Sequence, residues 1–230
     1  MLNPTVLLVN RARTTLGVTE EALARALQRY VDEALAPVWR TPCRLEVARD
    51  LRPGCWGLVF LEDADESHLL GYHDLTPDGL PLSKVFVQPT LADGQKVSVT
   101  ASHELAEMLV DPAINLLVHV DARTTYAYEV CDPVEGLELE IDGVALNDFV
   151  YPAWFEGFRP PGSARFDHLG KLTAPFQIHA GGYMPTFAGG KWSNVFGSVA
   201  TEQHHRRRDP RGHRRERRGR PHVRSTLSGR

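Results

Sequence analysis

The run from Thr100 to Pro112, Thr-Ala-Ser-His-Glu-Leu-Ala-Glu-Met-Leu-Val-Asp-Pro, brings one imidazole and three carboxylates close together. We expect a helix that ends near Val110, because the residue before a proline is biased away from the helical conformation. Each helical residue turns the side chain by about 100°. His103 and Glu107 therefore lie on one face, about 6 Å apart at Cβ, where they can hold one metal ion.

The same helix carries an apolar stripe beside this polar strip, to which Glu104 and Asp111 also belong. Asp93 is the expected N-cap, which would start the helix near residue 94. An exposed polar strip would be an ordinary solvated helix face. A buried strip would gather several carboxylates away from water, which is costly without a cation. The sequence therefore predicts either a solvated face or a metal site.

The motif His103-Glu104-x-x-Glu107 resembles the His-Glu-x-x-His helix of the zincin metallopeptidases, with Glu107 in place of the second histidine. The resemblance implies that His103 and Glu107 are metal ligands and that Glu104 is the general base that deprotonates a metal-bound water. It implies zinc as the metal. A donor set of one histidine and two carboxylates is rich in oxygen and would also suit manganese or magnesium.

The gluzincin branch of that family takes its third ligand from a glutamate at a distance along the chain comparable to that of Glu129 here. By the same resemblance, Asp132 matches an aspartate that supports the ligands, and Asp111 falls where thermolysin-like helices carry one. Either would orient His103 through its second ring nitrogen. We treat Asp111, Asp132 and His73 as orienting residues or alternative ligands. The run from Tyr126 to Cys131 alternates like a strand, whereas the gluzincin third ligand lies on a helix.

The elements expected before the metal helix are a buried strand, a helix capped by Thr19, and four further strands. Their expected ranges are 5–10 for the first strand, 19 to about 39 for the helix, and 44–48, 55–61, 69–75 and 84–87 for the other strands. Beyond the metal helix, Asp142-Gly143 predicts a hairpin turn, and residues 186–196 predict another hairpin. The predicted class is α+β.

This order resembles the zincin fold, which has a mixed twisted sheet with a backing helix and a metal-site helix, followed here by a β-rich C-terminal part. The resemblance implies that residues 69–75 form an edge strand, along which a peptide or protein substrate would pair by strand addition.

Charge divides the chain into a domain of residues 1–203 and a tail of residues 204–230. The tail carries eleven arginines against Asp209 and Glu216, whereas the domain carries 15 basic and 27 acidic residues. The tail has few large apolar residues, so we expect it to be disordered. Such an arginine run can bind nucleic acid without sequence specificity. The abrupt change after Gln203 also looks like low-complexity or out-of-frame coding sequence.

No apolar run reaches the about 18 residues that a transmembrane helix needs, and the N-terminus lacks the pattern of a signal peptide. Three cysteines, Cys43, Cys55 and Cys131, are few and odd in number, which predicts a reducing, cytoplasmic location.

The function predicted from these residues is zinc-dependent peptide hydrolysis. The alternative is a zincin-like scaffold that has lost its second histidine and its activity and now serves in binding or structure. The same motifs also resemble a group of bacterial and phage-associated proteins of unassigned function, so this alternative includes a phage-associated role.

Overall fold

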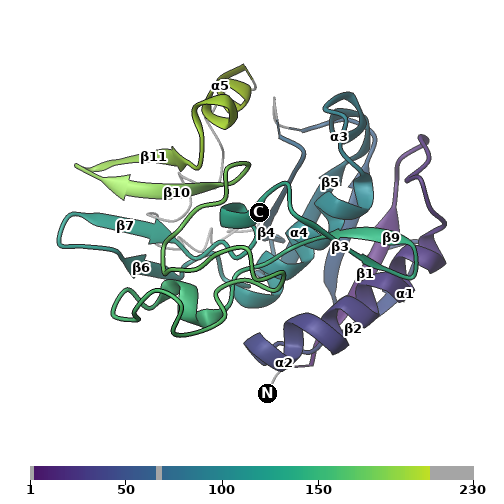
Figure 1. Cartoon of the computed structure of the whole chain (residues 1–230). Helices are drawn as coiled ribbons and strands as arrows, with labels where there is room; N and C mark the ends of the chain where they lie inside the picture. Colours follow the sequence, from purple (N-terminus) through teal and green to yellow (C-terminus); the bar gives the residue numbers. More distant parts are fainter. Residues whose placement is uncertain (1–2, 66–68, 208–230) are drawn as a thin grey trace, which may run out of the picture.

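The computed structural model describes residues 3–65 and 69–207, which form an α+β fold with a mixed five-stranded sheet (Figure 1). The strand order is β2-β1-β3-β5-β4, in which the first four strands are parallel and the edge strand β4 is antiparallel. The strands are β1 (Thr5–Asn10), β2 (Arg44–Val47), β3 (Trp56–Leu61), β4 (Gly71–Leu75) and β5 (Pro81–Phe86). The predicted α+β class and the edge position of β4 are confirmed.

The first helical segment starts where its cap predicts. The Ala22 N–H donates to Thr19 Oγ1 at 3.2 Å, and α1 (Glu20–Arg29) follows. A π-helical segment, η1 (Tyr30–Leu35), and α2 (Ala36–Trp39) continue it to the predicted end.

The predicted start of the helix that carries His103 is wrong. Asp93 ends a short helix, α3 (Val87–Ala92), and α4 (Val97–Val110) begins after Lys96 without a side-chain cap. Gly94, at φ +78°, makes the turn between the two helices, a conformation that glycine adopts without steric cost. The end of α4 at Val110 agrees with the effect of Pro112.

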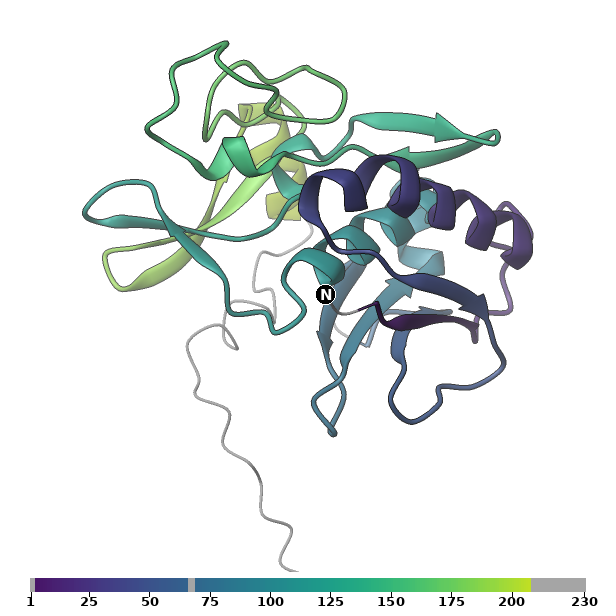
Figure 2. The ribbon, with the colours of Figure 1, turned by 90° about the horizontal axis from the view of Figure 1, so that it is seen from below.

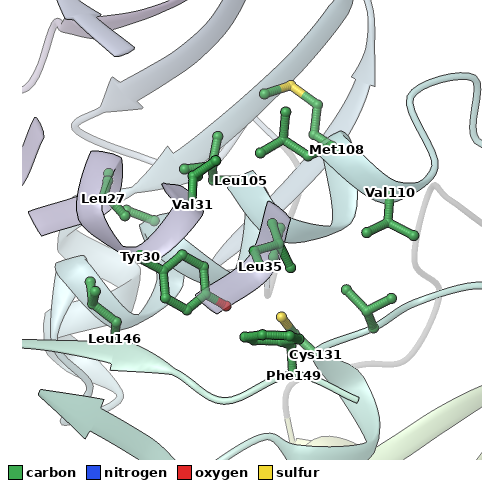
Figure 3. Packing of buried hydrophobic residues seen from close by; sticks show 14 of the residues in the cluster. Leu27, Tyr30, Val31, Leu35, Leu105, Met108, Val110, Cys131, Leu146 and Phe149 are labelled. Carbon is green, nitrogen blue, oxygen red and sulfur yellow. The ribbon is translucent and has the colours of Figure 1, made fainter. Parts of the chain in front are cut away.

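Helices α1 and α4 cover the same face of the five-stranded sheet (Figure 2). Their side chains share one core with the strands, in which Leu27 of α1 and Val31 of η1 lie near Leu105 of α4 (Figure 3). Burying such aliphatic side chains contributes about 1.5–3 kcal/mol each. The shared core fixes the position of α4 over β4 and β5.

A hairpin of β8 (Glu138–Ile141) and β9 (Val144–Asn147) packs against α4 away from the sheet. Ser98 Oγ donates to the Ala145 carbonyl at 2.7 Å, and Ser102 Oγ accepts from the Asn147 N–H at 2.7 Å. The turn at Asp142 and Gly143 has positive φ at both residues, as predicted for this dipeptide. This hairpin closes the side of α4 that a surface helix would expose.

The C-terminal part is β-rich, with a four-stranded antiparallel sheet in the order β11-β10-β7-β6. Its strands are β6 (Leu117–His119), β7 (Thr124–Ala127), β10 (Tyr183–Ala188) and β11 (Lys191–Phe196). Two 3-10 segments, η2 (Asp132–Val134) and η3 (Pro152–Phe155), lie between β7 and β10 in the chain. The strand expected over residues 126–131 is therefore wrong at both ends, because β7 begins at Thr124 and ends at Ala127.

A last helix, α5 (Val199–Arg207), runs across the domain boundary expected at residues 203 and 204. The rest of the expected tail, residues 208–230, lies outside the described residues. Among the residues that the structure describes, each helix is too short or too polar to cross a bilayer.

Candidate metal site on helix α4

Helix α4 is buried around its whole circumference. All fourteen of its residues are buried, and these include His103, Glu104 and Glu107. The solvated-face alternative is therefore wrong, because the sheet, the β8–β9 hairpin and the loop after β7 enclose the polar strip. Four carboxylates, those of Glu104, Glu107, Glu129 and Asp132, lie at 4% exposure or less.

His103 lies between two of these carboxylates. Its Nε2 atom is 3.2 Å from Glu107 Oε1 and 3.1 Å from Asp132 Oδ1. Within the described residues, neither oxygen of Asp132 accepts a hydrogen bond of normal geometry, although both are buried. Two atoms that bind one ion at about 2.1 Å lie about 3.0–3.4 Å apart at angles of 90–109°. The spacing of His103 from each carboxylate therefore fits a shared divalent cation.

The other oxygen of Glu107 faces a second histidine. His73, on the edge strand β4, is 1% exposed, and its Nδ1 atom lies 3.7 Å from Glu107 Oε2 and 3.9 Å from Glu104 Oε2. Ligand atoms of His73, Glu104 and Glu107 all lie within 4.8 Å of one another. The structure thus brings His73, which the sequence suggested only as an alternative ligand, into the centre of the cluster.

Glu129 lies in the loop after β7 and faces the Nε2 atom of His73. Its Oε2 atom is 4.0 Å from His73 Nε2. The sequence-based choice of third ligand was Glu129 with Asp132 behind it, and in the structure Asp132 is the residue in close contact with His103. Asp111 instead accepts hydrogen bonds from the backbone N–H groups of Asn115 and Leu116, at 3.0 and 3.1 Å, and shapes the loop after α4.

Close packing against β4 positions Glu104. A Cβ atom added to Gly71 would lie 2.9 Å from Glu104 Cγ, 2.9 Å from Glu104 Oε1 and 2.9 Å from the Lys84 carbonyl oxygen. The Glu104 carbonyl also accepts a hydrogen bond from Ser83 Oγ, at 2.9 Å. A residue without a side chain at position 71 is therefore what lets the Glu104 carboxylate lie against the edge strand.

The C-terminal sheet positions Asp132. The loop before β10 presses its backbone against η2, because a Cβ on Gly182 would lie 2.3 Å from the Pro133 carbonyl oxygen. The Pro133 carbonyl also accepts a hydrogen bond from the His179 N–H at 2.8 Å. Elements that are some fifty residues beyond Asp132 in the chain therefore hold its carboxylate against His103.

The excess of negative charge shifts the protonation of the cluster. Burial alone would lower the pKa of His103, but the charge of Glu107 and the close Asp132 carboxylate raise that pKa well above its usual value. Burial, followed by the charge of Glu107, raises the pKa of Asp132 to about 7. Both shifts mean that the cluster attracts positive charge, and a divalent cation would supply it.

Cys131 is a site neighbour that the sequence did not indicate. Its sulfur lies within 4.8 Å of ligand atoms of His103 and Glu107, and its N–H donates to Glu107 Oε1 at 3.4 Å. Its side chain also packs in the apolar core beside Phe149 (Figure 3). Burial raises the pKa of the thiol well above its usual value, which favours the neutral thiol of a core residue. All three cysteines are free thiols.

Comparison with known proteins gives no match. No family model, no curated protein and no solved structure matches this chain. The chemistry of the chain therefore has to be argued from the residues of the cluster.

Two features of the cluster were not predicted, the burial of His73 and the proximity of Cys131. A contact between Asp132 and His103 was expected through the second ring nitrogen, but Asp132 lies at Nε2, the same nitrogen that faces Glu107. The glycine at position 71, two residues before His73, was the one available signal that a backbone or side chain approaches β4 closely.

Proposed function

We propose that the protein is a metal-dependent hydrolase of the peptidase class, with a zincin-like arrangement of sheet, backing helix and metal helix. The observation that supports this proposal most directly is that the buried His103 imidazole lies within 3.2 Å of the Glu107 and Asp132 carboxylates. His103 and Glu107 would be ligands, with Asp132 or Glu129 as the third protein ligand. The bound metal would acidify water and polarise a carbonyl group.

Glu104 is the proposed general base. It follows the first ligand directly, and its carboxylate lies beside Glu107 and His73 rather than against His103. In that position it would accept a proton and return it to a leaving amine. The edge strand β4 would hold an extended peptide by strand addition, since β5 is its neighbour on one side in the sheet.

Zinc is the proposed metal, with manganese or magnesium as alternatives. Carboxylate oxygens outnumber imidazole nitrogens in the cluster, and hard oxygen donors suit manganese and magnesium better than they suit zinc. A cytoplasmic location is likewise a proposal, supported by the three free thiols. Nucleic-acid binding by the arginine-rich segment 204–230 rests on its charge alone.

A second candidate function is a metal-binding scaffold without hydrolytic activity, in a binding, structural or phage-associated role. The observation that favours it is the closure of the site, since the most exposed imidazole, His103, has a side-chain exposure of only 11%. A peptide has to reach the ligands for hydrolysis, whereas a structural metal needs no such access.

The deciding experiment is metal content by plasma mass spectrometry on the purified full chain, beside Glu107→Ala and a control variant, Glu140→Ala. Glu140 is exposed on β8, so this control removes one carboxylate away from the cluster. About one equivalent or more of metal, lost only in Glu107→Ala, would support the metal centre. The absence of metal from all three folded proteins would refute it.

Glu104→Gln then separates the two candidate functions. A peptidase would lose hydrolysis of a protein substrate by a factor of about 10²–10⁴ while keeping the ion held by His103 and Glu107. Hydrolysis that is unchanged in this variant would refute the role of Glu104. Wild-type protein that holds metal but cleaves nothing would favour the inactive scaffold.

A further inference from the structure

The cluster divides into two halves that share Glu107. One oxygen of Glu107 faces His103 at 3.2 Å, and the other faces His73 at 3.7 Å. Each half has a further carboxylate, which is Asp132 beside His103 and Glu104 beside His73. A carboxylate with one oxygen directed at each of two imidazoles has the arrangement of a ligand that bridges two metal ions.

The distances in the second half suit a metal ion. His73 Nδ1 lies 3.7 Å from Glu107 Oε2 and 3.9 Å from Glu104 Oε2. Two atoms bound to one ion at about 2.1 Å are about 3.0–3.4 Å apart at angles of 90–109°, so each pair would have to close by about 0.3–0.9 Å on binding. Small side-chain adjustments would therefore bring all three ligand atoms onto one ion.

The remaining nitrogen of His73 has a suitable orienting partner. Nε2 lies 4.0 Å from Glu129 Oε2, whereas Glu104 and Glu107 face the other ring nitrogen, Nδ1. A histidine that binds metal through one nitrogen commonly donates its other N–H to a carboxylate, which fixes the orientation of the ring. Glu129 would serve His73 in this way, which gives it a purpose even if Asp132 is the third ligand beside His103.

Charge balance favours two ions over one. The four carboxylates and two histidines are all 8% exposed or less. With both imidazoles neutral, as metal ligands must be, the six groups carry four negative charges. One divalent ion would leave two of these charges buried, whereas two divalent ions would neutralise all four. Buried charge without a counterion is strongly unfavourable.

From this geometry we infer that the protein has a second metal position, formed by His73, Glu104 and Glu107, with Glu107 bridging it to the first position at His103. The inference rests on the proposed metal centre and deepens it. Glu104 would be a proton acceptor in the protein with one ion and a ligand in the protein with two. Two-metal centres of this kind act on esters and amides with the ions about 3.5–4 Å apart.

The test uses Mn²⁺ alone, an ion that suits oxygen-rich sites and has an electron paramagnetic resonance signal. Full-length protein is titrated with Mn²⁺, and bound metal is counted after removal of free ion. We expect two equivalents in wild type with a spin-coupled signal from the ion pair. Glu104→Gln should bind one equivalent with an uncoupled signal, and Glu140→Gln should match wild type.

The outcomes separate the two proposals. One equivalent in wild type, with an uncoupled signal, would overturn the second position and leave the first intact. No bound ion in folded wild type would overturn both. Two coupled equivalents that persist in Glu104→Gln would overturn the ligand assignment. His73→Gln serves as the second test of the same position, and it should also reduce the count to one while the fold is retained.

Discussion

Gly71→Ala tests whether the missing side chain at position 71 exists to admit the Glu104 carboxylate. The added Cβ would lie 2.9 Å from two atoms of Glu104 and from the backbone oxygen of Lys84. Carbon atoms at optimal contact are about 3.5–4.0 Å apart, so the atoms have to separate by about 0.6–1 Å. Gly71 pairs with Val85 across the β4–β5 ladder, so the Glu104 side chain can yield more easily than the strand.

We expect this overpacking to destabilise the protein by about 1–3 kcal/mol, measured by urea unfolding. A displacement of about 1 Å in a catalytic group can lower the rate by about 10²-fold. Hydrolysis, if present, should therefore fall about 100-fold. The metal held by His103 and Glu107 should remain, because the atoms nearest to a Cβ at position 71 belong to Glu104 and Lys84.

A double-mutant cycle identifies which contact causes the destabilisation by Gly71→Ala. In a Glu104→Ala background the clash with the glutamate is gone, so the cost of Gly71→Ala should fall by at least about 1 kcal/mol. An equal cost in both backgrounds would mean that the strain arises at the Lys84 carbonyl, and the reasoning about Glu104 would be refuted.

Three further predictions concern other parts of the chain. Burial, followed by a hydrogen bond with Asp167, raises the pKa of Asp148 to about 8, so the native state binds this proton more tightly than the unfolded chain and loses stability as pH rises towards 8. Relative to wild type, the free energy of unfolding of Asp148→Asn should therefore rise by up to about 1.4 kcal/mol per pH unit between about pH 4 and 8. A difference in urea unfolding that does not change with pH would contradict this. Thr19→Ala should lower the free energy of unfolding by about 1 kcal/mol because the α1 cap is lost, whereas Thr15→Ala should lower it less. Equal losses of stability in the two variants would argue against a capping role. Deleting residues 208–230 should abolish any salt-sensitive DNA binding, and binding that survives the deletion would place it elsewhere.

Local signals predicted the elements that local physics determines. The alternation and β-branching of residues 5–10, the Thr19 cap and the Asp142-Gly143 turn each specify their structure within a few residues. The start of α4 was predicted wrongly because Asp93 is a good capping residue in isolation. It lies instead at the end of α3, a helix whose six residues gave no clear periodic pattern.

The site depended on contacts that are distant in sequence. The sequence placed His103, Glu104 and Glu107 on one helix face, but burial of that face requires the β8–β9 hairpin and the loop after β7. The position of Asp132 requires Gly182, fifty residues further along the chain. No periodicity within α4 carries that information, so the burial could not be predicted, and the contact of Asp132 with His103 was expected only from the resemblance to the gluzincins.

Burial of the cluster also bears on the choice between hydrolase and scaffold. Carboxylates that attract cations strongly would retain a metal in either case, so metal content alone identifies the centre without identifying an activity. Hydrolysis requires in addition that a substrate reach Glu104, which is 4% exposed and packed against β4. Under the proposed strand addition, the substrate would approach the site along the β4 edge. Activity would therefore depend on access to Glu104, whereas metal retention would depend on the charges around Glu107.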